Sequence, residues 1–277
     1  MPAYQRVGVV TKPGLPHRDE ALHLVERILR VSGAEIAPQD AAEDDIDLLL
    51  VLGGDGTILK AVRSFRTFAV PVLSVNRGTV GFLTEAALDE AEKLLPRLLR
   101  GEGAIDERAV LRVQALRGGT VVAEGHALNE AVVAQGSIAR IVDLRTAVDG
   151  ETLTTFNADG LIIATPTGST AYNLAAGGPV VHPSLPATIL TPINPHQFSQ
   201  KPIVLCGNSS IEVEVLARRS PAGVASVVLT LDGQVSVPLE SGDRIVARLD
   251  VRTVKFLRRK ESHFFGMLRE KLFRHAT

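Results

Sequence analysis

A run of five apolar residues that ends in a glycine-rich turn is the feature that most constrains the fold. Leu48–Leu52 is apolar at every position and is followed at once by GGDGT at residues 53–57. A strand without polar alternation is typical of a parallel sheet that is covered on both faces. Apolar residues at helical spacing resume over 57–65, so a strand, a turn and a helix follow one another. This order predicts an α/β domain that binds its ligand at the turn, where the strand ends.

The first hundred residues alternate between strand and helix patterns in the same way. Short β-rich runs lie at 6–10 and 70–75, and apolar residues recur at helical spacing over 18–31 and 88–99. Parallel strands need a crossover connection, which is usually a helix and is right-handed. This part of the chain therefore predicts a parallel sheet with right-handed helical crossovers.

The pattern changes after about residue 100. From Val110 onward, short runs of Val, Ile, Leu and Thr are separated by turn dipeptides, among them Gly118-Gly119, Asp149-Gly150 and Asp232-Gly233. Such dipeptides between apolar runs favour tight β-hairpins. We expect mostly antiparallel strands here, with a glycine-rich interruption at 165–178 that becomes helical beyond Thr170. The last twenty residues return to helical spacing.

Composition and charge exclude several classes of protein. The chain has 277 residues, of which 45% are hydrophobic, and its formal net charge is −1. The apolar content excludes a disordered chain, and the near-neutral charge argues against a general attraction to nucleic acid. No run approaches the roughly 18 apolar residues of a membrane span, and the N-terminus has too short an apolar stretch for a signal peptide. We expect a cytoplasmic protein that binds neither nucleic acid nor membrane.

Cysteine, histidine and the basic residues give three smaller predictions. A single cysteine, Cys206, excludes an intramolecular disulfide and a multi-cysteine zinc site, and we expect it to be buried at a strand end. The seven histidines show no metal-binding spacing. The basic cluster at 258–260 is expected to form a solvated face, with attraction to a polyanion as the alternative.

The GGDGT turn combines features of a phosphate site with an acid. Free N–H groups at a helix N-terminus suit phosphate, and glycine lets a ligand approach the backbone closely. No lysine follows the glycines as it does in a P-loop, and Leu59 breaks the dinucleotide-binding G-x-G-x-x-G spacing. Because Asp55 would repel phosphate, it indicates another role: accepting a proton from a hydroxyl, or holding Mg²⁺ beside the phosphates. The alternative is that Asp55 only caps the helix.

Two further segments carry polar groups in unusual places. Residues 159–172 (DGLIIATPTGSTAY) form an apolar strand that ends in a turn dense in hydroxyls, which suits a hydroxylated or phosphorylated ligand or, alternatively, an elaborate helix cap. Asn129 and Glu130 stand side by side in a strand-like run. They could bind a base edge and a ribose diol, or they could be a solvated polar pair, since adjacent strand residues point to opposite faces.

Taken together, these segments resemble the NAD kinase family, in the family's order and over nearly the whole chain. The matching stretches are 51–57 (VLGGDGT), 76–84 (NRGTVGFLT), 129–130 (NE), 159–172 (DGLIIATPTGSTAY), 177–179 with 182–184, 192–196 (PINPH) and 232–234 (DGQ). The resemblance implies an α/β nucleotide-binding domain at 1–100 with a parallel sheet, completed by a C-terminal helix at 255–277. A β-rich NAD-binding domain would occupy 101–254.

The resemblance also implies a reaction and its partners. A kinase of this family transfers a phosphoryl group from ATP, or from polyphosphate in some members, to the 2′-hydroxyl of the adenosine ribose of NAD and forms NADP. Mg²⁺, or another divalent cation, would arrive with the nucleotide rather than at a metal site of the protein, and homodimers or homotetramers are usual. Because GGDGT alone is shared more widely, a lipid or sugar kinase of the wider GGDGT group is the alternative, and a catalytically silent NADP sensor is a third reading.

Residue roles follow from the matched positions. Asp55 would be the base toward the 2′-hydroxyl, with Gly53, Gly54, Gly56 and Thr57 near phosphates. The residues implied to bind NAD are Asp55, Gly56, Asn129, Glu130, Arg140, Asp159, Thr170, Ala171, Tyr172, Ala175 and Gln234. The chain departs from common family residues at Ala134, Asn157 and Ala175, and none of these departures touches the implied base.

Overall fold

A computed structural model gives the fold of most of the chain in two compact units. It describes residues 3–12, 14, 17–38, 41–42, 45–64, 68–78, 81–136, 141–216, 219–220, 223–224, 226–260 and 264–273. The first unit comprises Met1–Glu107 with Val254–Thr277, and the second comprises Arg108–Thr253. Within the described residues, no helix is long and apolar enough to cross a bilayer.

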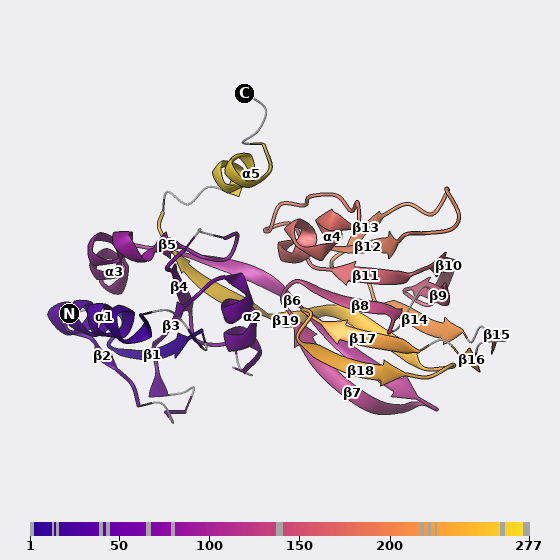
Figure 1. The fold of residues 1–277 in the computed structure, drawn as a ribbon, viewed down its shortest axis with the longest axis horizontal. Coiled ribbons are helices and arrows are strands. Elements are labelled where there is room, and N and C mark those ends of the chain that lie inside the picture. The colour runs from indigo at the N-terminus through magenta and orange to yellow at the C-terminus, as the bar shows by residue number, and fades with distance from the viewer. Residues whose placement is uncertain are drawn as a thin grey trace. The chain divides into compact units, whose positions relative to one another are not determined.

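The first unit is an α/β domain with a parallel sheet in the order β2-β1-β3-β4 (Figure 1). The short strand β5 and the end of β19 also pair with β4 in parallel. The elements are β1 (Arg6–Thr11), α1 (Arg18–Val31), β2 (Glu35–Ile36), β3 (Leu48–Leu52), α2 (Asp55–Ser64), β4 (Val72–Asn76), β5 (Ala86–Ala87), the 3₁₀ turn η2 (Leu88–Glu90), α3 (Ala91–Leu99) and α5 (Phe264–Leu272).

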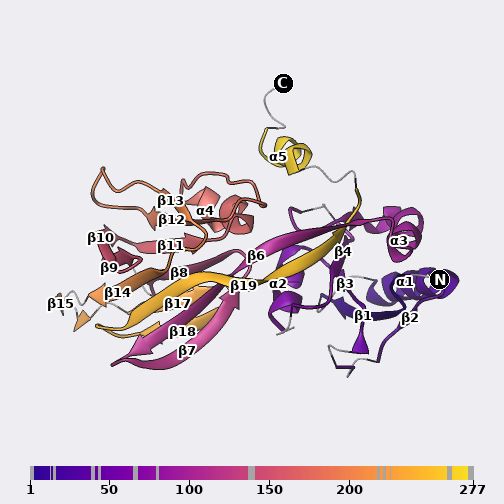
Figure 2. The same cartoon turned by 180° about the vertical axis from the view of Figure 1, so that it is seen from behind.

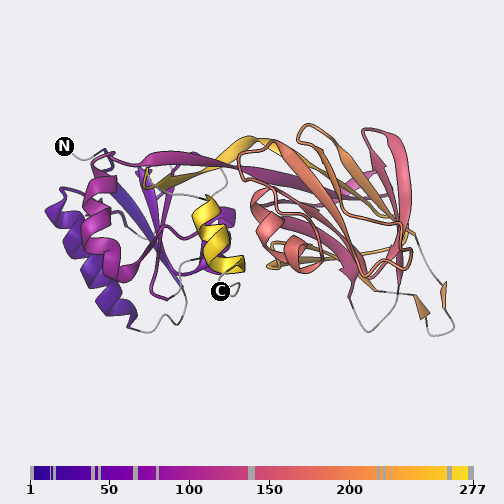
Figure 3. The same cartoon turned by 90° about the horizontal axis from the view of Figure 1, so that it is seen from above.

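Helices cover both faces of this sheet. Helices α1 and α3 lie side by side on one face (Figures 1 and 3) and share a buried cluster with β1, β3 and β4. On the other face, Val62 of α2 packs near Leu49 and Val72. All five residues of β3 are buried, which confirms the interpretation of the apolar run as a strand with two covered faces.

The predicted helix at 255–277 is wrong over its first part. Residues up to Arg258 belong to the long strand β19 (Arg244–Arg258), whose end pairs with β4 at Phe256 opposite Val72. Val254 and Phe256 are buried with the less buried Lys255 between them, and this period of two is that of a strand. The helix of this region, α5, comprises only Phe264–Leu272.

The second unit is a sandwich of two mainly antiparallel sheets, seen from the front in Figure 1 and from behind in Figure 2. One sheet has the order β13-β12-β11-β8-β17-β18; the other contains β10-β9-β14-β19, with β6 paired to β19 and β7 to β6. The elements are β6 (Ala104–Arg117), β7 (Thr120–Ala127), β8 (Glu130–Gln135), β9 (Val142–Val148), β10 (Glu151–Ala158), β11 (Gly160–Ala164), η3 (Thr167–Thr170), α4 (Tyr172–Ala175), β12 (Ala187–Ile193), β13 (Ile203–Cys206), β14 (Ile211–Leu216), β15 (Arg219–Ser220), β16 (Gly223–Val224), β17 (Val227–Leu231), β18 (Val235–Leu239) and β19. Side chains from both sheets form one buried core.

All three predicted hairpins are present. Gly118-Gly119, Asp149-Gly150 and Asp232-Gly233 each begin the turn between two antiparallel strands, and all six residues have positive φ, as mirror-image hairpin turns require. The helix expected beyond Thr170 is the single turn α4, which follows the 3₁₀ turn η3. The α/β first unit and the antiparallel β second unit confirm the predicted fold class.

Two predictions about single residues are wrong. Cys206 ends strand β13 as expected but is exposed. Strand β13 is at the edge of its sheet, and its alternate residues Val204 and Cys206 lie on the exposed face. The basic cluster at 258–260 is solvated only in part: Lys260 is exposed, whereas Arg258 is buried and pairs with Glu85 and Asp106. The sequence around Arg258 gives no sign of this burial, because both carboxylates that pair with it lie far away in the sequence.

Candidate active site

Asp55 stands where β3 gives way to helix α2, and a distant segment fixes its carboxylate. Oδ2 accepts a hydrogen bond from the backbone N–H of Phe82 at 3.1 Å, and Oδ1 accepts one from Leu83 at 3.2 Å. In the first turn of α2, the N–H groups of Thr57 and Ile58 donate to the carbonyl of Gly54 rather than to the carboxylate of Asp55. The carboxylate is therefore oriented by residues 82 and 83, and its observed bonds are not those of a helix cap.

Two glycines make this arrangement sterically possible, and a third leaves space beside it. A Cβ on Gly81 would lie 2.2 Å from Oδ1 of Asp55, and a Cβ on Gly53 would lie 2.5 Å from Oγ1 of the buried Thr57. A Cβ on Gly56 would meet no atom within 4 Å. Gly53 and Gly81 are thus needed for packing, whereas the open space at Gly56 suits the close approach of a ligand.

A pocket of about 430 Å³ opens beside this turn and contains two lysines. Lys12 follows β1 and Lys60 lies in α2; the remaining lining residues are Val10, Thr11, Gly54, Asp55, Gly56, Thr57, Ala61 and Ser64. Among the residues that the structure describes, neither lysine forms an ion pair. Two ammonium groups next to a helix N-terminus favour an anion such as phosphate.

In the second unit, Asp232 organises the strand start that holds Asn129 and Glu130. Its carboxylate accepts hydrogen bonds from the backbone N–H groups of Leu128, Asn129 and Glu130 at 2.9, 2.8 and 3.1 Å. The hairpin residue thus ties the β17–β18 turn to the beginning of β8. The solvated-pair alternative is wrong for Glu130, which is only 6% exposed.

The side chain of Glu130 is buried, and one of its oxygens accepts no hydrogen bond from the described residues. The N–H of Tyr172 donates to its carboxylate, and Oε2 has no hydrogen-bond partner among the described residues. Burial, together with the nearby carboxylate of Asp232, raises the pKa of Glu130 to about 8. A buried polar atom without a hydrogen-bond partner costs folding free energy, which indicates that a ligand binds to it.

The hydroxyl-rich segment after β11 divides into a buried scaffold and an accessible part. Thr165 Oγ1 donates to the carbonyl of Leu128 at 2.6 Å, and Ser169 Oγ donates to that of Val181 at 3.1 Å. These side chains serve the backbone and are fully buried. Thr170 and Ala171 are half-buried, and Tyr172 is 45% exposed, so these residues remain accessible to a ligand.

Other predicted site residues lie apart from this group or outside the described residues. Asp159 lies at the opposite end of β11 from residues 165–172, where its carboxylate accepts from the side-chain amide of Asn194 at 3.0 Å. Gln234 is exposed in the turn that contains Asp232, and Ala175 is the exposed last residue of α4. Arg140 lies outside the described residues.

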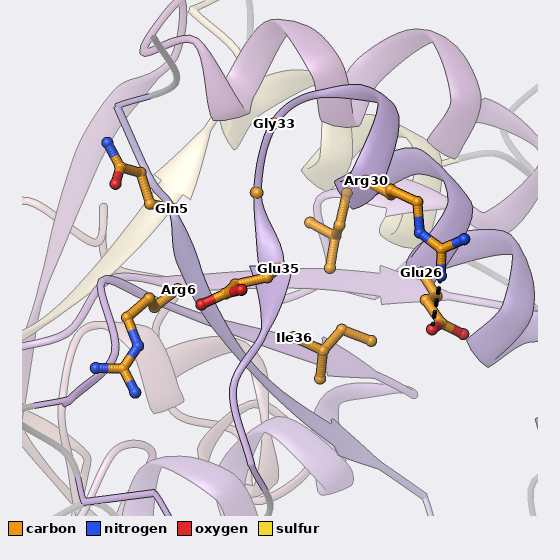
Figure 4. A pocket seen from close by; sticks show the side chains of 9 residues that line it. Gln5, Arg6, Glu26, Arg30, Gly33, Glu35 and Ile36 are labelled. Atoms are coloured by element: carbon orange, nitrogen blue, oxygen red, sulfur yellow. Dashed lines mark hydrogen bonds and ion pairs between the residues drawn. The ribbon is translucent and has the colours of Figure 1, made fainter.

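A larger hollow of about 740 Å³ in the first unit contains none of the predicted site residues. It lies between α1 and the edge strand β2, with Arg6 and Glu35 on one side and Arg30 and Glu26 on the other (Figure 4). Arg30 pairs with Glu26 at 3.3 Å. Its mixed and paired charges do not favour one ligand, so the smaller pocket beside Asp55 is the better candidate.

No cluster of three or more His, Cys, Asp or Glu side chains that could hold a metal ion occurs within the described residues.

The sequence motifs did not identify several residues of these sites. Lys12 could have been identified, because it directly follows a strand of the parallel sheet and so lies at the ligand-binding edge. Lys60 lies one helical turn after Gly56, and Asp232 belongs to a recognised hairpin dipeptide. Asn173 could not have been identified: its buried amide donates to the carbonyls of Ser169 and Pro179 at 3.1 and 3.0 Å, which only the fold reveals.

Comparison with known proteins identifies the family. Residues 34–103 match the family described as ATP-NAD kinase N-terminal domain, and residues 128–258 match the ATP-NAD kinase C-terminal domain. The chain is 42% identical over 250 residues to an NAD kinase of Geotalea daltonii, covering 90% of this chain and 85% of that protein. It is 39% identical over 287 residues to an NAD kinase of Solibacter usitatus, covering 98% of each.

Solved structures give the same result. A yeast NADH kinase complexed with NADH has a TM-score of 0.86 at 27% identity, covering 99% of this chain and 88% of the other. An NAD kinase from Archaeoglobus fulgidus in complex with ATP has a TM-score of 0.78 at 28% identity, covering 96% and 99%. The family matches span both units, and the chain belongs to the NAD kinase family.

Proposed function

We propose that this NAD kinase transfers a phosphoryl group from ATP or polyphosphate to the 2′-hydroxyl of the adenosine ribose of NAD, with Asp55 as the general base. The family membership supports the conversion of NAD to NADP. The observation that carries the residue assignment is the position of Asp55. This residue lines a pocket with Lys12 and Lys60, and its carboxylate is held by the N–H groups of residues 82 and 83.

The donor phosphates would bind in the pocket beside helix α2. The N-terminus of α2 and the two lysines of the pocket, Lys12 and Lys60, offer positive charge there, and Gly56 leaves room for close approach. Mg²⁺, or another divalent cation, would be held by the donor phosphates and would neutralise part of their charge. Asp55 is the acidic side chain of this pocket. Gly53, Gly54 and Thr57 would shape the turn.

Asp55 would accept the proton of the 2′-hydroxyl as the oxygen attacks phosphorus. Phosphoryl transfer passes through a loose transition state, so positioning and charge neutralisation contribute more than the base. General-base catalysis is typically worth about 10²–10⁴-fold in rate. The two backbone donors at 3.1 and 3.2 Å leave the remaining lone pairs of the carboxylate for the hydroxyl.

The adenosine half of NAD would bind in the second unit. Asn129 and the unpartnered Oε2 of Glu130 would meet the base or ribose, with Thr170 and Ala171 beside them and Tyr172 stacked on a ring face. Asp159, Ala175 and Gln234 are proposed as outer contacts. In this assignment, the predicted domain at 1–100 with 255–277 binds the donor and the one at 101–254 binds NAD. Cytoplasmic location and a homodimeric or homotetrameric state stay predictions.

The test is an assay of NADP formation with purified protein, NAD, Mg²⁺ and either ATP or polyphosphate. Diacylglycerol and a sugar phosphate, offered in parallel, test the alternative of a lipid or sugar kinase; turnover of either at the rate of NAD would overturn the proposed acceptor. An NAD analogue with a 2′-deoxy adenosine ribose should be inert, and its phosphorylation would refute the assigned hydroxyl. A complete lack of turnover with both donors would favour the silent sensor.

A further inference from the structure

The segment that holds the carboxylate of Asp55 is itself fixed by a buried serine. We call residues 81–85 the Asp55-binding segment. Ser74, on β4, is 1% exposed. Its Oγ donates to the carbonyl of Leu83 at 2.8 Å and accepts from the N–H of Glu85 at 3.1 Å. The N–H of Glu85 is shared with the backbone carbonyl of Ser74, also at 3.1 Å. The hydroxyl of Ser74 thus holds the carbonyl of Leu83 and helps to hold residue 85, next to the two N–H groups that bind Asp55.

The side chain of Thr84 forms a hydrogen bond within the same segment. The N–H of Gly81 donates to Thr84 Oγ1, and Thr84 is buried. Since a side chain on Gly81 would overlap the carboxylate of Asp55, the backbone of residue 81 forms the wall against which that carboxylate lies. The segment thus has little freedom at the end that meets Asp55.

Glu85 anchors the other end of the segment through two consecutive arginines. Its side chain is 2% exposed. Arg258 Nη1 lies 3.3 Å from Oε2, and Arg259 donates to Oε1 through both its backbone N–H and Nε, at 2.9 Å each. Arg259 Nη2 also donates to the carbonyl of Glu85 at 2.9 Å. These arginines come from the end of β19 and the residue that follows it.

Two further acids, Asp106 and Glu90, also form ion pairs with these arginines. Arg258 Nε lies 3.5 Å from Asp106, and Arg259 pairs with Glu90 at 3.3 Å. Hydrogen bonding to Arg259 lowers the pKa of Glu90. A buried charge is tolerated only when it is paired and hydrogen-bonded. Loss of the Glu85 charge would leave Arg258 with Asp106, and Arg259 with Glu90 and the carbonyl of residue 85, and would loosen this end of the segment.

We propose that Glu85 and Ser74 are positioning residues for the reaction: through the Asp55-binding segment they fix the direction in which the carboxylate of Asp55 points. The inference rests on the proposed role of Asp55 as the base. Both residues are buried, so they would act through this segment rather than by contact with substrate. Because catalysis depends steeply on geometry, a shift of about 1 Å in a reacting group can cost on the order of a hundredfold in rate.

The test compares Glu85→Gln and Ser74→Ala with the wild-type enzyme. Both variants should lower kcat by about 10- to 100-fold. They should change the KM for NAD by less than about threefold, because the residues proposed to bind the adenosine half of NAD belong to the second unit. Asp243→Asn is the matched control. Asp243 is equally buried and pairs with Arg117 at 2.9 and 2.8 Å in the second unit, so its loss should lower Tm similarly while kcat stays within about threefold.

A double variant separates positioning from a general loss of structure. In the Asp55→Asn background there is no base to direct, so adding Glu85→Gln should lower kcat by less than about threefold. If Glu85→Gln lowers kcat equally in both backgrounds, or if both single variants keep wild-type kcat, the positioning role is wrong. If Asp55→Asn alone keeps wild-type kcat, the assignment of the base fails instead.

Discussion

A methyl group on Gly81 would lie 2.2 Å from Oδ1 and 2.5 Å from Oδ2 of Asp55, so the carboxylate lies directly against the backbone of residue 81. Real Cβ atoms do not approach an oxygen so closely. The same carboxylate receives the N–H groups of the next two residues, Phe82 and Leu83. Gly81 is therefore part of the surface that orients Asp55.

Gly81→Ala should displace the Asp55 carboxylate and lower kcat by about a hundredfold, since a misplacement of roughly 1 Å has that cost. Steady-state kinetics and the Tm of the variant measure the two effects. Gly78→Ala is the control, because its Cβ would meet no atom within 4 Å and kcat should stay within about threefold. Equal kcat values for the two variants would show that contact with Gly81 does not direct Asp55.

Lys12→Ala and Lys60→Ala should each raise the KM for ATP by about tenfold, because each removes a positive charge from the pocket beside α2. The KM for NAD should change little, and the effect on ATP should shrink as salt is added. Lys93→Ala, at an exposed position on α3, is the charge-matched control. If the KM for ATP of both variants equals that of Lys93→Ala, these lysines do not bind the phosphoryl donor.

Tyr172→Ala should weaken NAD binding by about 1–2 kcal/mol and leave kcat nearly unchanged, because an exposed ring contributes stacking rather than chemistry. The Kd for NAD, measured by calorimetry, and kcat at saturating NAD separate the two quantities. Tyr172→Phe should restore the affinity. A large fall in kcat with unchanged affinity would place Tyr172 in the chemical step instead.

The pKa of Glu130 predicts a pH dependence of stability. Because burial raises it from 4.5 to about 8, the folded protein keeps a proton that the unfolded chain releases. The stability from this group is complete below about pH 4.5 and is lost as the pH rises toward 8. Glu130→Gln, which cannot ionise, should gain on the order of a few kcal/mol relative to wild type between pH 5 and pH 8.

Urea unfolding at pH 5, 6.5 and 8 measures this difference. Glu151→Gln, which removes an exposed carboxylate on β10, is the control and should follow the wild type at every pH. If the stability difference between Glu130→Gln and wild type does not change with pH, Glu130 ionises normally in the folded protein.

The parts of the fold with a strong local signal were predictable. The apolar run of β3, the helical spacing of α1 and the three glycine-containing hairpins depend on neighbouring residues, and each is found as predicted. The end of β19 was mistaken for a helix because its partner, β4, lies far away in the sequence. For the same reason, the buried pairing of Arg258 with Glu85 was not foreseen.

Within the candidate site, the sequence indicated which residues matter and the structure shows what holds them. The acid in GGDGT pointed to Asp55, but the donors from Phe82 and Leu83 follow from the path of the chain after β4. The pair at 129–130 gave no sign that Glu130 is buried, because its burial depends on Asp232 and α4. Such contacts join residues of high sequence separation and leave no local pattern.

The role of Asp55 as the general base is tested most directly by the kcat of Asp55→Asn at saturating NAD and ATP, measured together with the Kd for NAD. Asn keeps the size of the side chain and an oxygen for one of the backbone donors, but it cannot accept the proton of the 2′-hydroxyl. We expect a loss of at least about a hundredfold in kcat, with NAD affinity preserved. A variant that binds NAD normally and turns over within a few-fold of wild type would contradict this role.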